Sequence, residues 1–114
     1  MAHVIAVLKA LADETRYKLV KLLLAHDYCV GALARQLGIS ESAVSQHLKV
    51  LRQAGLVRGE KRGYFTHYVV EWRLLKEAAS NLVELADSAR VRPRCPRLTG
   101  GGPTCRGEEE KLDD

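Results

Sequence analysis

Apolar residues recur at spacings of three and four along five stretches of this chain. This spacing predicts amphipathic helices over residues 2–12, 14–26, 30–37, 40–54 and 71–90. In the first, the apolar positions are Val4, Ile5, Leu8, Leu11 and Ala12. In the second they extend most of the way round, which predicts a helix buried between other helices. Residues 56–61 and 64–70 predict two strands, and Lys61-Arg62-Gly63 between them predicts the turn of a β-hairpin.

The third and fourth stretches have a spacing that is typical of a helix-turn-helix. Ala34 lies four residues before Gly38, Ile39 follows at once, and Val44 comes six residues after the glycine. A small residue lets two helices cross closely, glycine ends the first helix at little cost, and Ser40 caps the second. With the hairpin directly after it, this pair predicts a winged helix-turn-helix, mainly α with a β-hairpin wing, in the order α-α-α-α-β-β-α. Helical pairs that bind no DNA share parts of this pattern.

The outward side of the fourth helix carries hydroxyl, amide and ammonium groups if Val44, Leu48 and Leu51 face inward. Ser and Gln can bond base edges in the major groove, Lys can reach a phosphate, and Arg62 at the hairpin tip can enter the minor groove. We therefore predict that DNA is contacted by Ser40, Ser42, Ala43, Ser45, Gln46, Lys49, Arg58, Lys61, Arg62 and Tyr64. The alternative is a solvated basic face. His47 beside the inner stripe is expected to pack rather than read bases, and His3, His26 and His67 are expected at the surface.

The last predicted helix has a seam of apolar residues that resembles one strand of a coiled coil. The seam consists of Trp72, Leu75, Ala79, Leu82, Ala86 and Ala89. A chain this short offers it no obvious partner, so we expect the helix, with residues 2–12, to form a homodimer interface. Packing within one chain is the alternative.

Composition agrees with a single DNA-binding domain. The chain has 114 residues and a net charge of +4, and its basic residues exceed its acidic ones between Arg35 and Arg62. We expect a winged-helix DNA-binding and dimerisation domain over residues 1–90. Prolines and glycines after residue 90 predict a flexible, cysteine-containing tail over residues 91–114. Neither a membrane span nor a signal peptide is evident, so a cytoplasmic protein is expected. No catalytic constellation is visible, and an enzyme is not expected.

Three segments, LADETRYKLVKLLL, VSQHLKVLRQAGLV and RGEKRGYFTHYVV, together resemble the ArsR/SmtB family of bacterial winged-helix repressors over about residues 5–90. The resemblance implies a homodimer on an imperfect palindrome in double-stranded DNA. It also implies release by an inducer, usually a thiophilic metal or metalloid ion, with no permanent cofactor. Arsenic-sensing members carry two cysteines separated by one residue near the third helix, and here only Cys29 matches. Residues 71–90 contain no histidine, so the zinc site that some members have on the last helix is not expected.

The chain has three cysteines, Cys29, Cys95 and Cys105, and they do not form the cysteine pair of the arsenic-sensing members. They are too few for a disulfide framework. Cys95 and Cys105 are ten residues apart around a triple glycine and can close on one ion together with Cys29 from either chain. Three thiolates suit trivalent arsenic or antimony, whereas zinc normally takes a fourth ligand. The alternatives are a cadmium or lead site, a redox or reactive-sulfur switch on the same thiols, incidental cysteines, or a DNA binder without a ligand.

Overall fold

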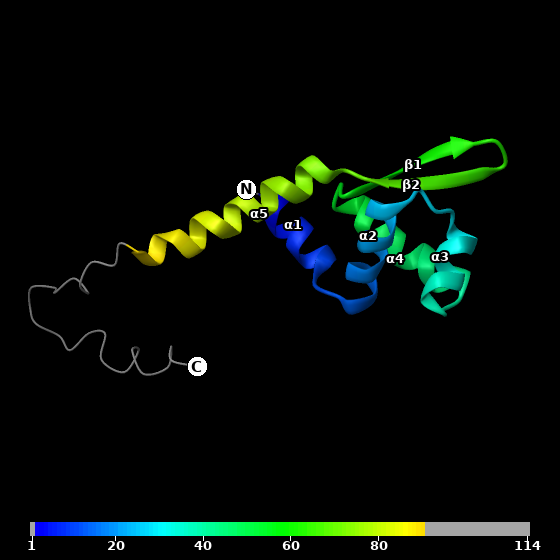
Figure 1. Ribbon diagram of the computed structural model, residues 1–114, viewed down its shortest axis with the longest axis horizontal. Helices are drawn as coiled ribbons and strands as arrows, with labels where there is room; N and C mark the ends of the chain where they lie inside the picture. The colour runs from blue at the N-terminus through cyan, green and yellow to red at the C-terminus, as the bar shows by residue number, and fades with distance from the viewer. Residues whose placement is uncertain (1, 91–114) are drawn as a thin grey trace, which may run out of the picture. The chain divides into compact units, whose positions relative to one another are not determined.

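The computed structural model describes residues 2–90 and places the helices and strands in the predicted order (Figure 1). The helices are α1 (Ala2–Leu11), α2 (Glu14–Ala25), α3 (Val30–Leu37), α4 (Glu41–Gln53) and α5 (Trp72–Asp87). The strands are β1 (Val57–Arg62) and β2 (Phe65–Val70), and a 3-10 turn, η1 (Ser88–Arg90), follows α5. The chain divides into a unit of residues Met1–Val83, which contains the core, and a second of residues Glu84–Asp114. The predicted tail with Cys95 and Cys105 lies outside the described residues.

The core of the first unit is made of aliphatic side chains from α1 to α4 and from the ends of the hairpin. Its most deeply buried members are Val7, Leu19, Leu33, Val44, Leu48, Leu51 and Leu56. The predicted inner stripe of α4 is thus confirmed. In α1 the buried positions are Val4, Val7 and Ala10, of which only Val4 belongs to the apolar set named from the sequence, and Ile5 is 55% exposed. Tyr17 and Leu24 of α2 are also about half exposed, because only one side of that helix meets the core.

The turn between α3 and α4 forms as the sequence pattern predicts. Gly38 ends α3 with a φ of +70°, a conformation that glycine adopts without a side-chain clash. Its N–H and that of Ile39 both donate to the carbonyl of Ala34, at 2.8 and 3.2 Å. Ser40 then caps α4, since its Oγ accepts a hydrogen bond of 3.0 Å from the N–H of Ala43. The helix-turn-helix is therefore fixed by its own backbone hydrogen bonds.

The wing is a two-stranded antiparallel hairpin whose last pair is Arg62 with Phe65. Its turn is Gly63-Tyr64, one residue later than predicted, because Arg62 still pairs within β1. Gly63 has a φ of +68°, which a two-residue hairpin turn requires. A short third partner joins the other edge of β2: Cys29 forms an antiparallel bridge with His67, and the N–H of Tyr68 donates to the Tyr28 carbonyl at 3.2 Å. The wing is thereby attached to the start of α3.

The first half of α5 packs on the core through Leu74, Leu75 and Ala78. Of the predicted seam, Leu75 is half-buried within this chain, while Trp72, Ala79, Leu82, Ala86 and Ala89 are exposed. Most of the seam is therefore exposed, and the core of this chain does not cover it. No helix among residues 2–90 is both long and apolar enough to span a membrane.

Candidate nucleic-acid interface

The outward side of α4 carries a row of polar side chains opposite its buried stripe. Ser42, Ser45, Gln46 and Lys49 are exposed, at spacings of three and four that place them on one side of the helix. None of these four side chains forms a hydrogen bond or ion pair with any residue between 2 and 90. Hydroxyl, amide and ammonium groups with no internal partner are free to bond base edges and phosphates. The structure therefore brings together this part of the predicted DNA contacts.

Ser40 and Ala43 lie at the start of the same helix but have a structural task as well. The Ser40 side chain is exposed and accepts the Ala43 N–H, so it saturates one of the first N–H groups of α4. The remaining free N–H groups at this end and the helix dipole favour an anion such as a phosphate. Both residues thus lie where a DNA backbone could approach the helix end.

Arg16 connects three elements that set the position of α4. Its Nε donates to the carbonyl of Ala10 at 2.6 Å, and its Nη1 lies 3.4 Å from Nδ1 of His47 on α4. The carboxylate of Asp13 caps α2 through the N–H of Arg16 at 3.0 Å and lies 4.0 Å from the same His47 nitrogen. His47 therefore packs on the start of α2, as its place beside the inner stripe predicts. The sequence alone does not identify Arg16 as its partner.

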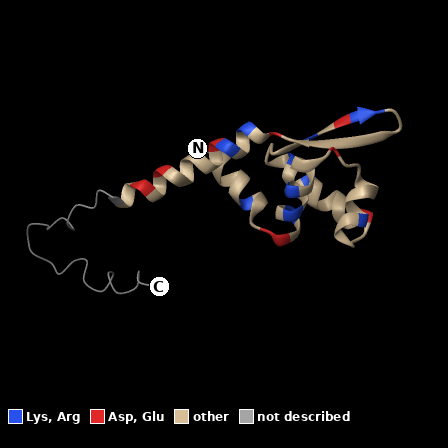
Figure 2. Ribbon diagram, viewed as in Figure 1, with Lys and Arg blue, Asp and Glu red and all other residues tan. Residues whose placement is uncertain are grey.

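The arginines of the wing are paired with carboxylates of the same chain. Arg62 Nη2 lies 2.8 Å from Oδ2 of Asp27 and 2.7 Å from Oε1 of Glu60. Arg58 bonds the other oxygen of Glu60, and its Nε lies 2.7 Å from Oε2 of Glu71. Figure 2 shows the acidic and basic segments following one another along β1. Two predicted DNA contacts, Arg58 and Arg62, are therefore engaged within the molecule.

These hydrogen bonds favour the charged forms of Glu60, Arg58 and Arg62. The bond from Arg62, with that from Arg58, holds the pKa of Glu60 below its usual value. The bond to Glu60 raises the pKa of each of the two arginines, with smaller contributions from Glu71 at Arg58 and from Asp27 at Arg62. The network thus contains two positive and three negative charges near neutral pH. Asp27 and Glu71 lie outside the hairpin in the sequence, so only the folded chain reveals their part in it.

The tip of the wing presents an unpaired cation and two aromatic rings. The Lys61 side chain has no hydrogen-bond or ion-pair partner in the described range. Tyr64 is fully exposed and the neighbouring Phe65 is 61% exposed. Lys61 and Tyr64 are thus as accessible as their predicted DNA contacts require. Phe65 is not among the predicted contacts, although its place directly after the turn could have indicated an exposed ring.

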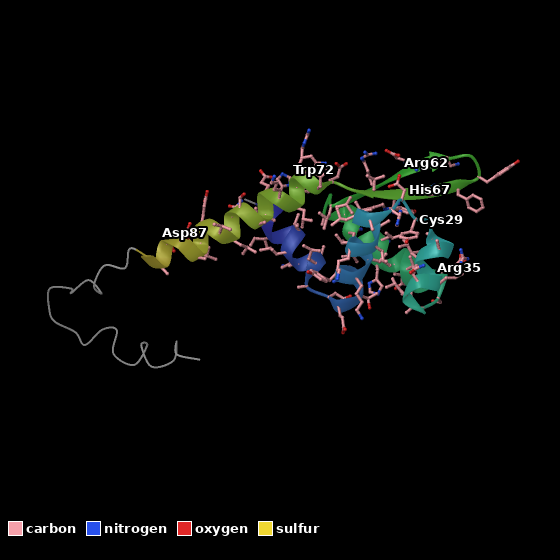
Figure 3. The ribbon with its side chains drawn as sticks, in the orientation of Figure 1. Cys29, Arg35, Arg62, His67, Trp72 and Asp87 are labelled. Carbon is pink, nitrogen blue, oxygen red and sulfur yellow. The ribbon has the colours of Figure 1, made fainter. Side chains whose placement is uncertain are left out.

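Cys29 lies where the helix-turn-helix and the wing meet. It is the residue that precedes α3, its side chain makes no capping hydrogen bond, and its thiol is free. His67, its bridge partner, is half-buried, with an Nδ1 that is buried and lacks a hydrogen-bond partner, so a simple surface position is wrong for this histidine (Figure 3). Within residues 2–90 no group of three or more His, Cys, Asp or Glu side chains could hold a metal ion. Any ion bound by Cys29 would need further ligands from beyond residue 90 or from another chain.

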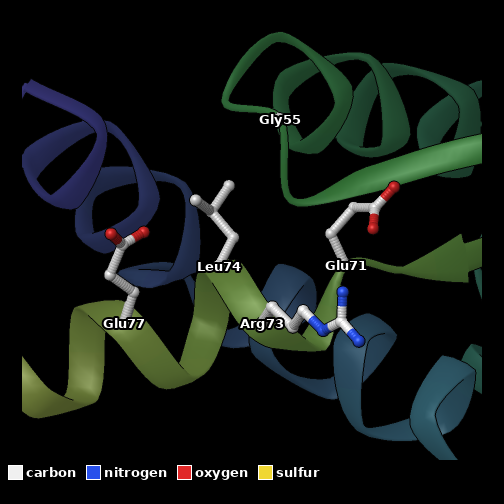
Figure 4. Close-up of a pocket in the computed structure, with 5 residues that line it drawn as sticks. All are labelled: Gly55, Glu71, Arg73, Leu74 and Glu77. Carbon is white, nitrogen blue, oxygen red and sulfur yellow. The ribbon is translucent and has the colours of Figure 1, made fainter.

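A separate depression lies between the end of α4 and the start of α5. It has a volume of about 560 Å³ and is lined by Gly55, Glu71, Arg73, Leu74 and Glu77 (Figure 4). Glu71 already pairs with Arg58, and the Arg73 guanidinium carbon lies 5.2 Å from the centre of the Trp72 ring. Its lining includes no thiol or imidazole, so it offers no soft ligand to a thiophilic ion.

Comparison with known proteins agrees with this geometry. A family model described as bacterial regulatory protein, arsR family, matches residues 13–58, from the cap of α2 through α4 into β1. The transcriptional repressor SdpR of Bacillus subtilis is 33% identical over 72 residues, which cover 63% of this chain and 80% of that protein. The arsenical resistance operon repressor of Escherichia coli is 42% identical over 65 residues, but the match spans only 56% of either protein.

Among solved structures, an ArsR-like transcriptional regulator from Rhodococcus sp. RHA1 has the same fold. It superposes with a TM-score of 0.71 at 30% sequence identity, over 78% of this chain and 84% of that one. The fold that the two share is that of the winged helix-turn-helix ArsR regulators. This chain therefore belongs to the ArsR family of bacterial regulatory proteins, which are DNA-binding regulators of transcription and not enzymes.

Proposed function

We propose that this protein is a homodimeric repressor that binds an imperfectly palindromic operator and leaves it when a thiophilic species binds its cysteines. Trivalent arsenic or antimony is the inducer that three thiolates fit best, because these ions bind three sulfur atoms and need no further ligand. The ligands would be Cys29, Cys95 and Cys105, with Cys29 from the same chain or its partner. Repression itself is supported by relatives that are named as repressors.

The position of Cys29 is the observation that carries this proposal. The backbone carbonyl of Cys29 accepts the N–H of Leu33 at 3.0 Å in the first turn of α3, while the residue also bridges His67 of the wing. A group bound to this thiol would therefore act on both DNA-facing elements at once. A ligand changes DNA affinity only through such differential contacts between the bound and free conformations.

The tail cysteines can complete a site without a large entropic cost. Closing the ten-residue loop between Cys95 and Cys105 costs about 2 kcal/mol plus a constant, since the cost grows as (3/2)RT ln n. Structural zinc bound by protein ligands contributes roughly 10–16 kcal/mol, which indicates how far a thiophilic ion can exceed that cost. A bound ion would thus order the two tail thiols around Cys29.

The test is operator binding by fluorescence anisotropy under reducing conditions, with arsenite, antimonite, cadmium and zinc added in turn. We expect release by arsenite and antimonite, and we expect Cys95→Ser or Cys105→Ser to remove that release without changing affinity for the operator. Normal release from every single cysteine variant would exclude the three-thiol site.

The same thiols support a second function, a redox or reactive-sulfur switch, because Cys29 is a free thiol with no capping bond at the start of a helix. In that case none of the ions would release the operator, whereas a polysulfide or peroxide would do so. Release by cadmium alone would identify a cadmium sensor. No release by any of these agents would mean a regulator without a thiol ligand.

A further inference from the structure

Three consecutive residues before α3 each contact the wing, and we call residues 27–29 the strap. Asp27 pairs with Arg62 at 2.8 Å, the Tyr28 carbonyl accepts the Tyr68 N–H at 3.2 Å, and Cys29 bridges His67. Figure 3 labels Cys29, His67 and Arg62 at this junction. The strap therefore holds the wing through both its backbone and a charged side chain.

The charged contact differs from the backbone contacts because it uses a group that DNA also needs. Arg62 points to Asp27 and Glu60, and Glu60 is shared with Arg58. The side chains of Arg62 and Asp27 are 44% and 39% exposed. Ion pairs that solvent reaches are weak, so a phosphate can displace a carboxylate from such an arginine. A phosphate also offers the guanidinium two oxygens in a matching geometry.

We propose that Arg62 exchanges partners: the Asp27 carboxylate holds it in the free protein, and an operator phosphate takes it in the complex. Asp27 then acts as an internal competitor that lowers the affinity of the wing for DNA. Glu60 keeps Arg62 near the strand in both states because Arg58 anchors its other oxygen. The inference rests on DNA binding by this family and is independent of the inducer, so it can fail while the thiol proposal holds, and the reverse.

The experiment measures operator affinity by anisotropy without any inducer, over a range of salt concentrations. Asp27→Asn removes the carboxylate charge and keeps the side-chain shape. We expect it to bind the operator about 1.5- to 5-fold more tightly for each wing on DNA, the range that exposed ion pairs give. Arg62→Ala should bind more weakly and lower the slope of log K against log salt by about 0.9 for each lost phosphate contact.

The double variant separates partner exchange from a general effect of charge. Removing any carboxylate near DNA increases attraction to phosphates, and that general gain would persist when Arg62 is absent. Partner exchange instead requires that Asp27→Asn has little effect in the Arg62→Ala background. Glu14→Gln serves as the matched control, since Glu14 pairs with Lys18 at 3.4 Å and not with the wing.

Several outcomes would overturn the exchange. They are an unchanged or weaker affinity of Asp27→Asn, the same gain in both Arg62 backgrounds, or a salt slope that Arg62→Ala leaves unaltered. Thermal unfolding of each variant shows whether it is folded. An Arg62→Lys variant, which keeps the charge, should retain the salt slope if the first substitution disturbs the hairpin.

Discussion

A single hydroxyl group caps the start of α4. The Oγ of Ser40 accepts the N–H of Ala43, and no other side chain in the described range does so. We predict that Ser40→Ala lowers the free energy of unfolding by about 1 kcal/mol, the usual value of an N-cap. Urea unfolding measures the change, and Ser42→Ala is the control because its exposed side chain bonds nothing within residues 2–90. Equal losses in both variants would contradict the capping role.

Asp13 makes the stability of the start of α2 depend on pH. The hydrogen bond from the Arg16 N–H, assisted by the charge of Arg16, holds the pKa of Asp13 below its ordinary value of 3.8. A carboxyl whose pKa is lower in the folded state stabilises the protein above its unfolded pKa, and this contribution is lost as the pH falls through the lowered value. We predict that Asp13→Asn is less stable than wild type near neutral pH and that the difference shrinks below about pH 4. Thermal midpoints across this range would show it, and a constant difference would argue against it.

At the scale of elements, we expect the exposed polar row of α4 to contact DNA in two ways. Gln46 offers an amide that can recognise one base edge, whereas we expect the Lys49 ammonium to contact a backbone phosphate. We predict that Gln46→Ala reduces the preference for operator over random DNA, by roughly 1–3 kcal/mol if it pairs with a base. Lys49→Ala should weaken binding to both DNAs alike and lower the salt slope by about 0.9 per contact. If Gln46→Ala weakened binding to both DNAs alike and Lys49→Ala reduced the preference for the operator, Gln46 would not be the residue that reads a base.

The helices and the turn could be predicted from sequence because their signals are local. The buried stripe of α4, the Gly38 turn and the Ser40 cap each depend on residues within a few positions of one another. The state of the wing arginines could not be predicted in this way. Their partners, Asp27 and Glu71, lie just before α3 and just before α5. These residues are far from β1 in the sequence or outside it, and only folding brings their carboxylates to the arginines. Charge counted along the segment therefore overestimated the basic character of the wing.

At the scale of the whole molecule, the outer side of α5 exposes large apolar side chains. Trp72, Leu82 and Val83 are each about half exposed, although side chains of this size are usually covered. We predict that Leu82→Glu converts a dimer into a monomer and abolishes palindrome binding, because a charge cannot be buried there without a partner. Sedimentation velocity measures the state.

Ser80→Glu is the matched control for that variant, since it adds the same charge at an exposed polar position of α5. It should leave both the dimer and operator binding intact. A wild-type protein that sediments as a monomer would remove the basis for assigning this side of α5 to a dimer interface.

The strap has a consequence for how the protein behaves at high concentration. An isolated two-stranded hairpin has two open edges, and an open edge can pair with the same edge of another molecule and begin aggregation. Tyr28 and Cys29 pair with the outer edge of β2 at its middle, at His67 and Tyr68, while β1 carries charged residues such as Glu60 and Lys61. One edge is blocked by backbone pairing and the other by charge. The hairpin can therefore project into solvent without acting as a template for intermolecular β-sheet.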